Sequence, residues 1–112
     1  MTPTTQLTPP ELHALAIDAA REAEAEFMNE YGEPAYCGFA WVTLFIDGRK
    51  PFAKELIKDG IVSKSWDGRG YIVWNPAGNG TQSMDVKECG AEAYARIFRE
   101  HGIQAYMGSR AD

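Results

Sequence analysis

Hydrophobic residues recur along the chain at two different spacings, which predict helices and strands in alternation. Between residues 9 and 30 they return at every third or fourth position, opposite a face rich in glutamate, as in an amphipathic helix. Thr8 is the expected N-cap of this helix, and Glu11 stands at the position that a capping box requires. The predicted buried stripe of this helix consists of Leu12, Leu15, Ala16, Ala19, Ala23 and Phe27.

Residues 36–46 alternate strictly between two faces and predict the clearest strand of the chain. Both faces are apolar, which is typical of a central strand that is covered on both sides. One face carries Cys37, Phe39, Trp41, Thr43 and Phe45, and the other carries Gly38, Ala40, Val42, Leu44 and Ile46.

Two further helices and a final strand follow from local signals. Pro51 suits the first position of a short helix, and Gly60 ends it. Residues 85–101 predict a third helix that begins at Asp85, and residues 103–107 alternate again as a last strand. In the third helix the positions expected to face inward are Val86, Cys89, Ala93 and Ile97.

The Asp67-Gly68 pair stands between two alternating runs and predicts a hairpin with a two-residue turn, because both central residues of such a turn adopt positive φ. In this register Lys64 lies opposite Tyr71, and aromatic and basic side chains gather on one face. That face carries Trp66, Arg69, Lys64 and Tyr71. The other face carries Ile61, Ser63, Ser65, Gly70, Ile72 and Trp74.

After the first helix the order of elements is β-α-β-β-α-β, which predicts an α+β, ferredoxin-like antiparallel sheet with the first and third strands in the centre. Helices cover only one face of such a sheet, although both faces of the strand at 36–46 are apolar. We expect the N-terminal helix to cover the second face, and a homodimer partner is the alternative. The chain is expected to form a single domain over residues 1–112, with a frayed tail at 1–8, the acidic helix at 9–30 and the βαββαβ core at 36–108.

Charge is distributed unevenly along the sequence. The chain carries a net charge of −5, but residues 1–35 contain seven acids and one base, a net −6, so the remainder is close to neutral. This acidity argues against nucleic-acid binding through a general basic patch.

No apolar run approaches the length of a membrane span, and the Thr/Pro-rich start lacks the layout of a signal peptide, so we expect a cytoplasmic protein with no membrane contact. Cys37 and Cys89 are expected to be free thiols.

Motifs of catalysis are missing from the sequence. It contains no nucleophile elbow, P-loop, dinucleotide-binding glycine pattern or His/Cys cluster with metal-ligand spacing. We therefore favour a binding protein with no catalytic residue, metal or cofactor. A small enzyme stays as an alternative, because a fold can assemble a catalytic site from residues that form no motif in the sequence. The words Arg69-Gly70-Tyr71 resemble the start of the signature of the RNA-recognition module, but Ile72-Val73-Trp74 departs from its continuation. A nucleic-acid partner is accordingly not favoured.

Two candidate binding sites emerge. The first is the hairpin face of Trp66, Arg69, Tyr71 and Lys64, either exposed as a contact surface or buried under the N-terminal helix. The second is the Gly/Asn-rich loop at 75–83, which leads into a helix start and offers backbone and side-chain donors to an anion. Simple capping of the helix by Ser83 or Asp85 is the alternative there. The residues expected to contribute to the second site are Asn79, Gln82, Ser83 and, from the C-terminus, Arg110.

Several short sequence segments between residues 36 and 112 resemble segments of a group of small, uncharacterised accessory proteins of tailed bacteriophages. These segments are CGFAWV (37–42), Phe52-Ala53, Trp74-Asn75, Gln82-Ser83, Lys87-Glu88, Gly90-Ala91 and GIQAYMGSRAD (102–112). The resemblance implies a protein made in the bacterial cytoplasm that acts by binding a host or anti-phage defence protein. It carries over no catalytic residue. A small-ligand binder that sequesters a nucleotide-like or other anionic molecule is the alternative hypothesis.

Overall fold

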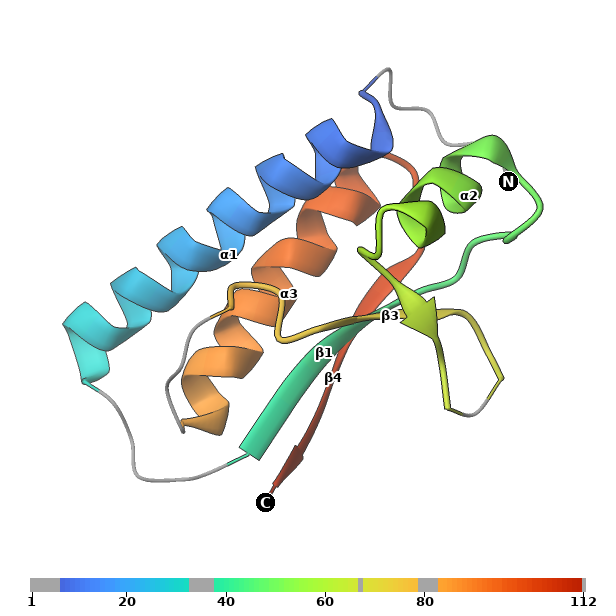
Figure 1. Cartoon of the computed structure of the whole chain (residues 1–112). Coiled ribbons are helices and arrows are strands. Elements are labelled where there is room, and N and C mark those ends of the chain that lie inside the picture. Colours follow the sequence, from blue (N-terminus) through green and yellow to red (C-terminus); the bar gives the residue numbers. More distant parts are fainter. Residues whose placement is uncertain (1–6, 33–37, 67, 79–82, 112) are drawn as a thin grey trace.

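The computed structural model describes residues 7–32, 38–66, 68–78 and 83–111, which form three helices and one four-stranded sheet (Figure 1). The chain is therefore α+β, as predicted. In chain order the elements are α1 (Pro9–Tyr31), β1 (Gly38–Leu44), α2 (Pro51–Lys58), β2 (Ser63–Lys64), β3 (Tyr71–Trp74), α3 (Met84–Glu100) and β4 (Ala105–Ala111).

The sheet is antiparallel throughout, with the strand order β2-β3-β1-β4. The first and third strands are thus central, which confirms that part of the prediction. Trp41 of β1 lies opposite Trp74 of β3 on one side and opposite Gly108 of β4 on the other. This register brings the second half of β4 beside the beginning of β1.

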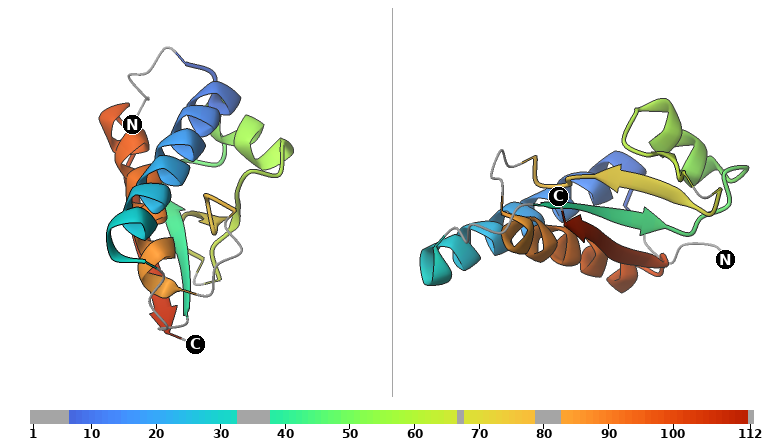
Figure 2. Two further views of the ribbon diagram at one scale, coloured as in Figure 1. Left: turned by 90° about the vertical axis from the view of Figure 1, so that its left-hand side faces the viewer. Right: turned by 90° about the horizontal axis from the view of Figure 1, so that it is seen from below.

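The helices and one face of the sheet enclose the core. Along β1 every second residue is buried, and Ala40, Val42 and Leu44 share one hydrophobic cluster with residues of α1 and α3. Figures 1 and 2 show α1 running alongside α3. The expectation that the N-terminal helix covers the second face of β1 is therefore wrong, because α1 packs in the helical layer, chiefly against α3 and also against α2.

Small residues at the contact explain why α1 packs against α3. Ala16 and Ala20 of α1 are fully buried, as is Ala91 of α3, so the two helices approach closely. At the tightest point the side chain of Glu24 lies over Gly90, where an added Cβ would come within 2.1 Å of a Glu24 carboxylate oxygen. Close contact along most of α1 leaves it unavailable to cover the other face of the sheet.

The predicted start of α1 is confirmed, but its buried stripe is rotated. The side chain of Thr8 accepts a hydrogen bond from the N–H of Glu11, and the Glu11 carboxylate accepts one from the N–H of Thr8. Leu15, predicted to be inward, is exposed. The buried positions of α1 are instead Pro9, Leu12, Ala16, Ala20 and Glu24.

The last helix and strand also differ from their predictions. Ser83, not Asp85, is the N-cap of α3, because its Oγ accepts the N–H of Val86 at 3.4 Å. The helix is buried against both α1 and the sheet, so more of its surface is inward than one stripe, namely Val86, Gly90, Ala91, Tyr94, Ala95 and Phe98. Cys89, Ala93 and Ile97 are only partly buried. The final strand begins at Ala105 and continues to Ala111, beyond the predicted end at residue 107.

The hairpin keeps its predicted register but not its predicted turn. Lys64 pairs with Tyr71, and regular pairing of β2 with β3 ends there. The N–H of Gly68 donates to the carbonyl of Ser65 at 3.0 Å, and the N–H of Ser65 donates to the carbonyl of Gly70 at 3.1 Å. The turn thus starts at Ser65, one residue before Trp66, while Asp67 lies outside the described residues.

None of the described helices is long and apolar enough to cross a membrane.

Candidate functional site

The second face of the sheet, which we call the open face, is the largest exposed aromatic surface of the described chain. Strand alternation places Phe39, Trp41 and Thr43 of β1 on this face, opposite the buried positions. Cross-strand pairing adds Trp74 from β3 and Tyr106 from β4. None of the described helices covers this face.

Exposure of large hydrophobic side chains is concentrated there. Seven such side chains are exposed in the described part of the chain, and four of them belong to the open face. These four are Phe45 (45% exposed), Trp66 (68%), Trp74 (51%) and Tyr106 (52%). Contiguous exposed apolar patches are uncommon on monomeric proteins and mark interaction sites.

All three tryptophans of the chain form one cluster on the open face. The rings of Trp41 and Trp74 are stacked, with centroids 5.8 Å apart and planes 4° apart. Trp66 meets both rings edge-on, at 5.1 Å from Trp41 and 6.4 Å from Trp74. Phe39 extends the cluster with its ring 5.6 Å from that of Trp74.

A glycine on the neighbouring strand makes room for the central ring. An added Cβ at Gly108 would lie 2.6 Å from Nε1 of Trp41, so the indole rests directly on the backbone of β4. Trp41 is held between two strands, whereas Trp66 reaches the cluster from the hairpin turn. The cluster therefore has a fixed base and a more exposed rim.

Positive charge borders the cluster. A hollow of about 400 Å³ on the open face is lined by Trp41, Trp66, Trp74, Ser109 and Arg110. Arg110 lies opposite Phe39 in the sheet, and Nζ of Lys87 lies 5.1 Å from the centroid of the Phe39 ring. The four strands as described contain no acidic residue. The open face is thus aromatic and basic although the chain is acidic.

The predicted hairpin face does not form as one surface. Nζ of Lys64 lies 5.2 Å from the centroid of the Tyr71 ring, so these two residues stay together. Lys64 and Tyr71 belong to the opposite face of the sheet, because the residues next to them along the strands, Ser63 and Ile72, pair with each other on the open face. Trp66 instead joins Trp41 and Trp74, because the chain leaves the strand at Ser65 and alternation ends. Arg69 is exposed in the turn region.

The predicted loop site is described only in part. Asn79 and Gln82 lie outside the described residues. Ser83 is buried and caps α3, as in the capping alternative. Arg110, the residue expected from the C-terminus, lines the hollow on the open face, and the hydroxyl of the neighbouring Ser109 donates to Glu88 of α3.

The sequence-based interpretation missed Trp41 and Trp74 as site residues. The signal was present, because the alternation at 36–46 places Phe39, Trp41 and Phe45 on one face. That face was assigned to a helix that packs elsewhere. Within the described ranges no group of three or more His, Cys, Asp or Glu residues is arranged to hold a metal ion.

A partly buried polar pair joins α1 to α3 away from the open face. Nδ1 of His13 lies 2.6 Å from the hydroxyl of Tyr94. Burial lowers the pKa of His13 and raises the pKa of Tyr94 well above its usual range. Both groups are thus held neutral at pH 7 and form a structural hydrogen bond between the helices.

Comparison with protein families, with curated proteins and with solved structures found no match for this chain.

Proposed function

We propose that this chain is a non-catalytic binding protein whose working surface is the open face of the sheet, and that its partner is a protein. The observation that carries the proposal is the exposed Trp41–Trp66–Trp74 cluster on a sheet face that no described helix covers. Tryptophan and arginine are the residues most enriched at energetic hot spots of protein interfaces. Each large aromatic ring buries about 150–250 Å² when covered, so the cluster alone supplies the centre of an interface.

Charge favours a different molecule over a second copy of this chain. In a symmetric dimer through the open face, Arg110 of each protomer would approach the same basic rim, and the described strands carry no acid to pair with it. The partner is therefore expected to present acidic side chains around an apolar centre. The acidic α1 lies in the helical layer and is a separate surface.

The resemblance to bacteriophage accessory proteins supports a host or anti-phage defence protein as that partner, met in the bacterial cytoplasm. We further infer that the core after α1 is ferredoxin-like. The order β2-β3-β1-β4 with antiparallel neighbours supports this assignment. Such a core leaves one sheet face free unless an added element covers it.

Capture from bacterial lysate with paired variants tests the proposal. The double variant Trp66→Ala/Trp74→Ala removes exposed rings from the open face, and Leu15→Ala/Tyr31→Ala removes exposed apolar side chains from α1 as the matched control. We expect the tryptophan variant to retain at least about tenfold less of one specific protein, and the α1 variant to retain it fully. The captured protein, once purified, should bind with the same ranking in a calorimetric titration.

A charge pair of variants sharpens the test. Arg110→Glu should weaken binding and reduce its dependence on salt, whereas Arg96→Glu on the exposed side of α3 should not. Equal capture by the parent and the tryptophan variant would remove the open face from consideration. Loss of capture in the α1 control instead would move the site to the acidic helix.

Single-stranded nucleic acid is a second candidate, favoured by one observation. Trp41 and Trp74 stand on the two central strands beside Arg110 and Lys87, and aromatic rings next to cations are the elements of a base-stacking groove. An oligothymidylate of about 15 nucleotides should then quench tryptophan emission, with affinity falling steeply between about 50 and 200 mM salt. Absence of quenching at the lower salt concentration would exclude this candidate.

A further inference from the structure

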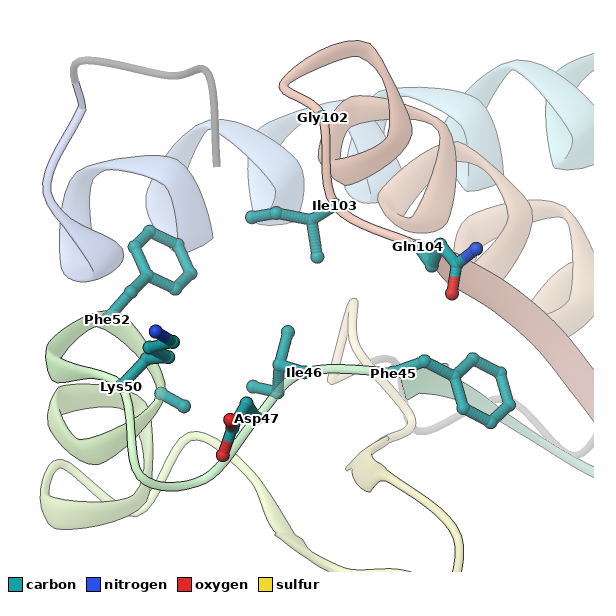
Figure 3. A pocket seen from close by; sticks show the side chains of 9 residues that line it. Phe45, Ile46, Asp47, Lys50, Phe52, Gly102, Ile103 and Gln104 are labelled. Carbon is teal, nitrogen blue, oxygen red and sulfur yellow. The ribbon is translucent and has the colours of Figure 1, made fainter. Parts of the chain in front are cut away.

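A second, smaller hollow lies beyond the C-terminal end of β1, away from the tryptophan cluster (Figure 3). It has a volume of about 170 Å³ and is bounded by the end of β1, the start of α2 and the turn between α3 and β4. Figure 3 shows the side chains of Ile46 and Ile103 extending toward each other across it, with Phe52 contributed by α2. Three separate segments thus supply its walls.

The floor of this hollow is apolar and belongs to the core. Ile103 and Ala53 are buried, and Ile46 and Phe52 pack against the main hydrophobic cluster. An apolar cavity of roughly 150 Å³ lined by aliphatic and aromatic side chains is large enough to hold a single benzene ring. The space therefore matches one ring or one branched aliphatic group.

The mouth of the hollow is charged. Asp47 and Lys50 line it, and the carboxylate of Asp47 accepts hydrogen bonds from the backbone N–H, Nε and Nη2 of Arg49 at 3.0–3.1 Å. These hydrogen bonds lower the pKa of Asp47 to about 2, so its negative charge persists at neutral pH and is already engaged by Arg49. With the exposed ammonium group of Lys50, the three side chains sum to one positive charge.

We propose that this hollow binds a small organic carboxylate, with an apolar ring or branched chain on the Ile46–Ile103 floor and the carboxylate at Lys50. The neutral counterpart of such a ligand would fill the floor equally well but would lose the attraction at the mouth. This site uses none of the open-face residues on which the proposed function depends, except that Phe45 borders both regions. Its failure and the failure of the proposed function are therefore separate outcomes.

Phenylacetate is a suitable probe, and phenylacetamide is its uncharged control. In methyl-labelled protein, phenylacetate should shift the methyl resonances of Ile46 and Ile103 with a dissociation constant of about 1 mM, as expected for a ligand of this size. Ile17 and Ile97, which lie on α1 and α3, should not shift. Phenylacetamide should bind about two- to fivefold more weakly, because an exposed ionic contact is worth little more than this.

Variants at the start of α2 separate the contribution of charge from that of the cavity. Lys50→Gln should weaken phenylacetate binding about two- to fivefold and leave phenylacetamide binding unchanged, whereas Lys54→Gln, exposed on α2 and not part of the lining, should change neither. Ala53→Leu should fill the floor and abolish binding of both compounds, with its fold checked by thermal unfolding. Equal affinities of phenylacetate and phenylacetamide, or an absence of shifts at Ile46 and Ile103 in the parent, would overturn the proposal.

Discussion

At the scale of single residues, the His13–Tyr94 hydrogen bond links the two longest helices. His13 is half-buried and Tyr94 is fully buried, and their rings meet edge-on with centroids 5.7 Å apart. A neutral imidazole accepts or donates one hydrogen bond here without carrying a charge into the helix contact. Protonation of His13 would place a partly desolvated cation there.

This burial predicts a dependence of stability on pH. The pKa of His13 is lowered in the folded protein, so the unfolded chain takes up the proton at higher pH, near the ordinary value of 6.5. The part of the free energy of unfolding that depends on a neutral His13 is therefore present above about pH 6.5 and is lost as the pH falls below this value. Urea unfolding should give a free energy of unfolding that falls between about pH 7.5 and 5.5 in the parent and falls less in His13→Gln. An identical decline in both proteins would show that another group is responsible.

At the scale of elements, the contact between α1 and α3 depends on the absence of a side chain at position 90. Glu24 is only 2% exposed, and its Cγ and carboxyl carbon would each lie 2.7 Å from an added Cβ at Gly90. Alanine is a better helix former than glycine by about 1 kcal/mol, so propensity alone favours Gly90→Ala. The steric conflict with Glu24 opposes this gain, because the buried carboxylate side chain has little room to move.

A double-mutant cycle separates the two effects. We expect Gly90→Ala to destabilise the protein by about 1–3 kcal/mol despite its better helix propensity, since overpacking a close contact has a cost of this size. In the background of Glu24→Ala the same change should be neutral or stabilising, which gives a coupling energy of more than about 0.5 kcal/mol. Unfolding in urea measures all four proteins. Additive effects would show that the helices can separate freely at this point.

At the scale of the whole molecule, charge and aromatic surface are segregated. The described α1 carries six acids and one base, whereas the described strands carry no acid. All three tryptophans lie on the open face, so intrinsic fluorescence reports on that face alone. A soluble quencher can therefore distinguish an exposed face from one that a second copy covers.

We expect iodide to quench the tryptophan emission of the folded protein more strongly than caesium does. Arg110 and Lys87 border the tryptophan cluster and attract the anion, and Trp66 and Trp74 are more than half exposed. The difference should shrink in about 1 M salt, where charges are screened within about 3 Å. Weak quenching by both ions at low salt would indicate that the open face is covered in solution.

Local signals in the sequence determined most of the elements but not their neighbours. The capping box at Thr8 and Glu11, the short helix between Pro51 and Gly60 and the pairing of Lys64 with Tyr71 depend on interactions within a few residues, and the structure contains all of them. The position of Trp66 depends on the residue at which the hairpin turn begins. The hydrogen bond from the N–H of Gly68 to the carbonyl of Ser65 starts the turn one residue earlier than predicted. A displacement of that size is enough to move an aromatic side chain to the other face of the sheet.

The sequence by itself determined that β1 is an apolar, central strand and that the acidic residues concentrate in the first helix. Only the tertiary structure decided which face of β1 the helices cover, because periodicity tells which positions are apolar and not what lies against them. Ala16 and Ala20 fit the small residues of α3, so α1 joined the helical layer. The other face, with Trp41 beside Gly108, was thereby left open as the candidate binding surface.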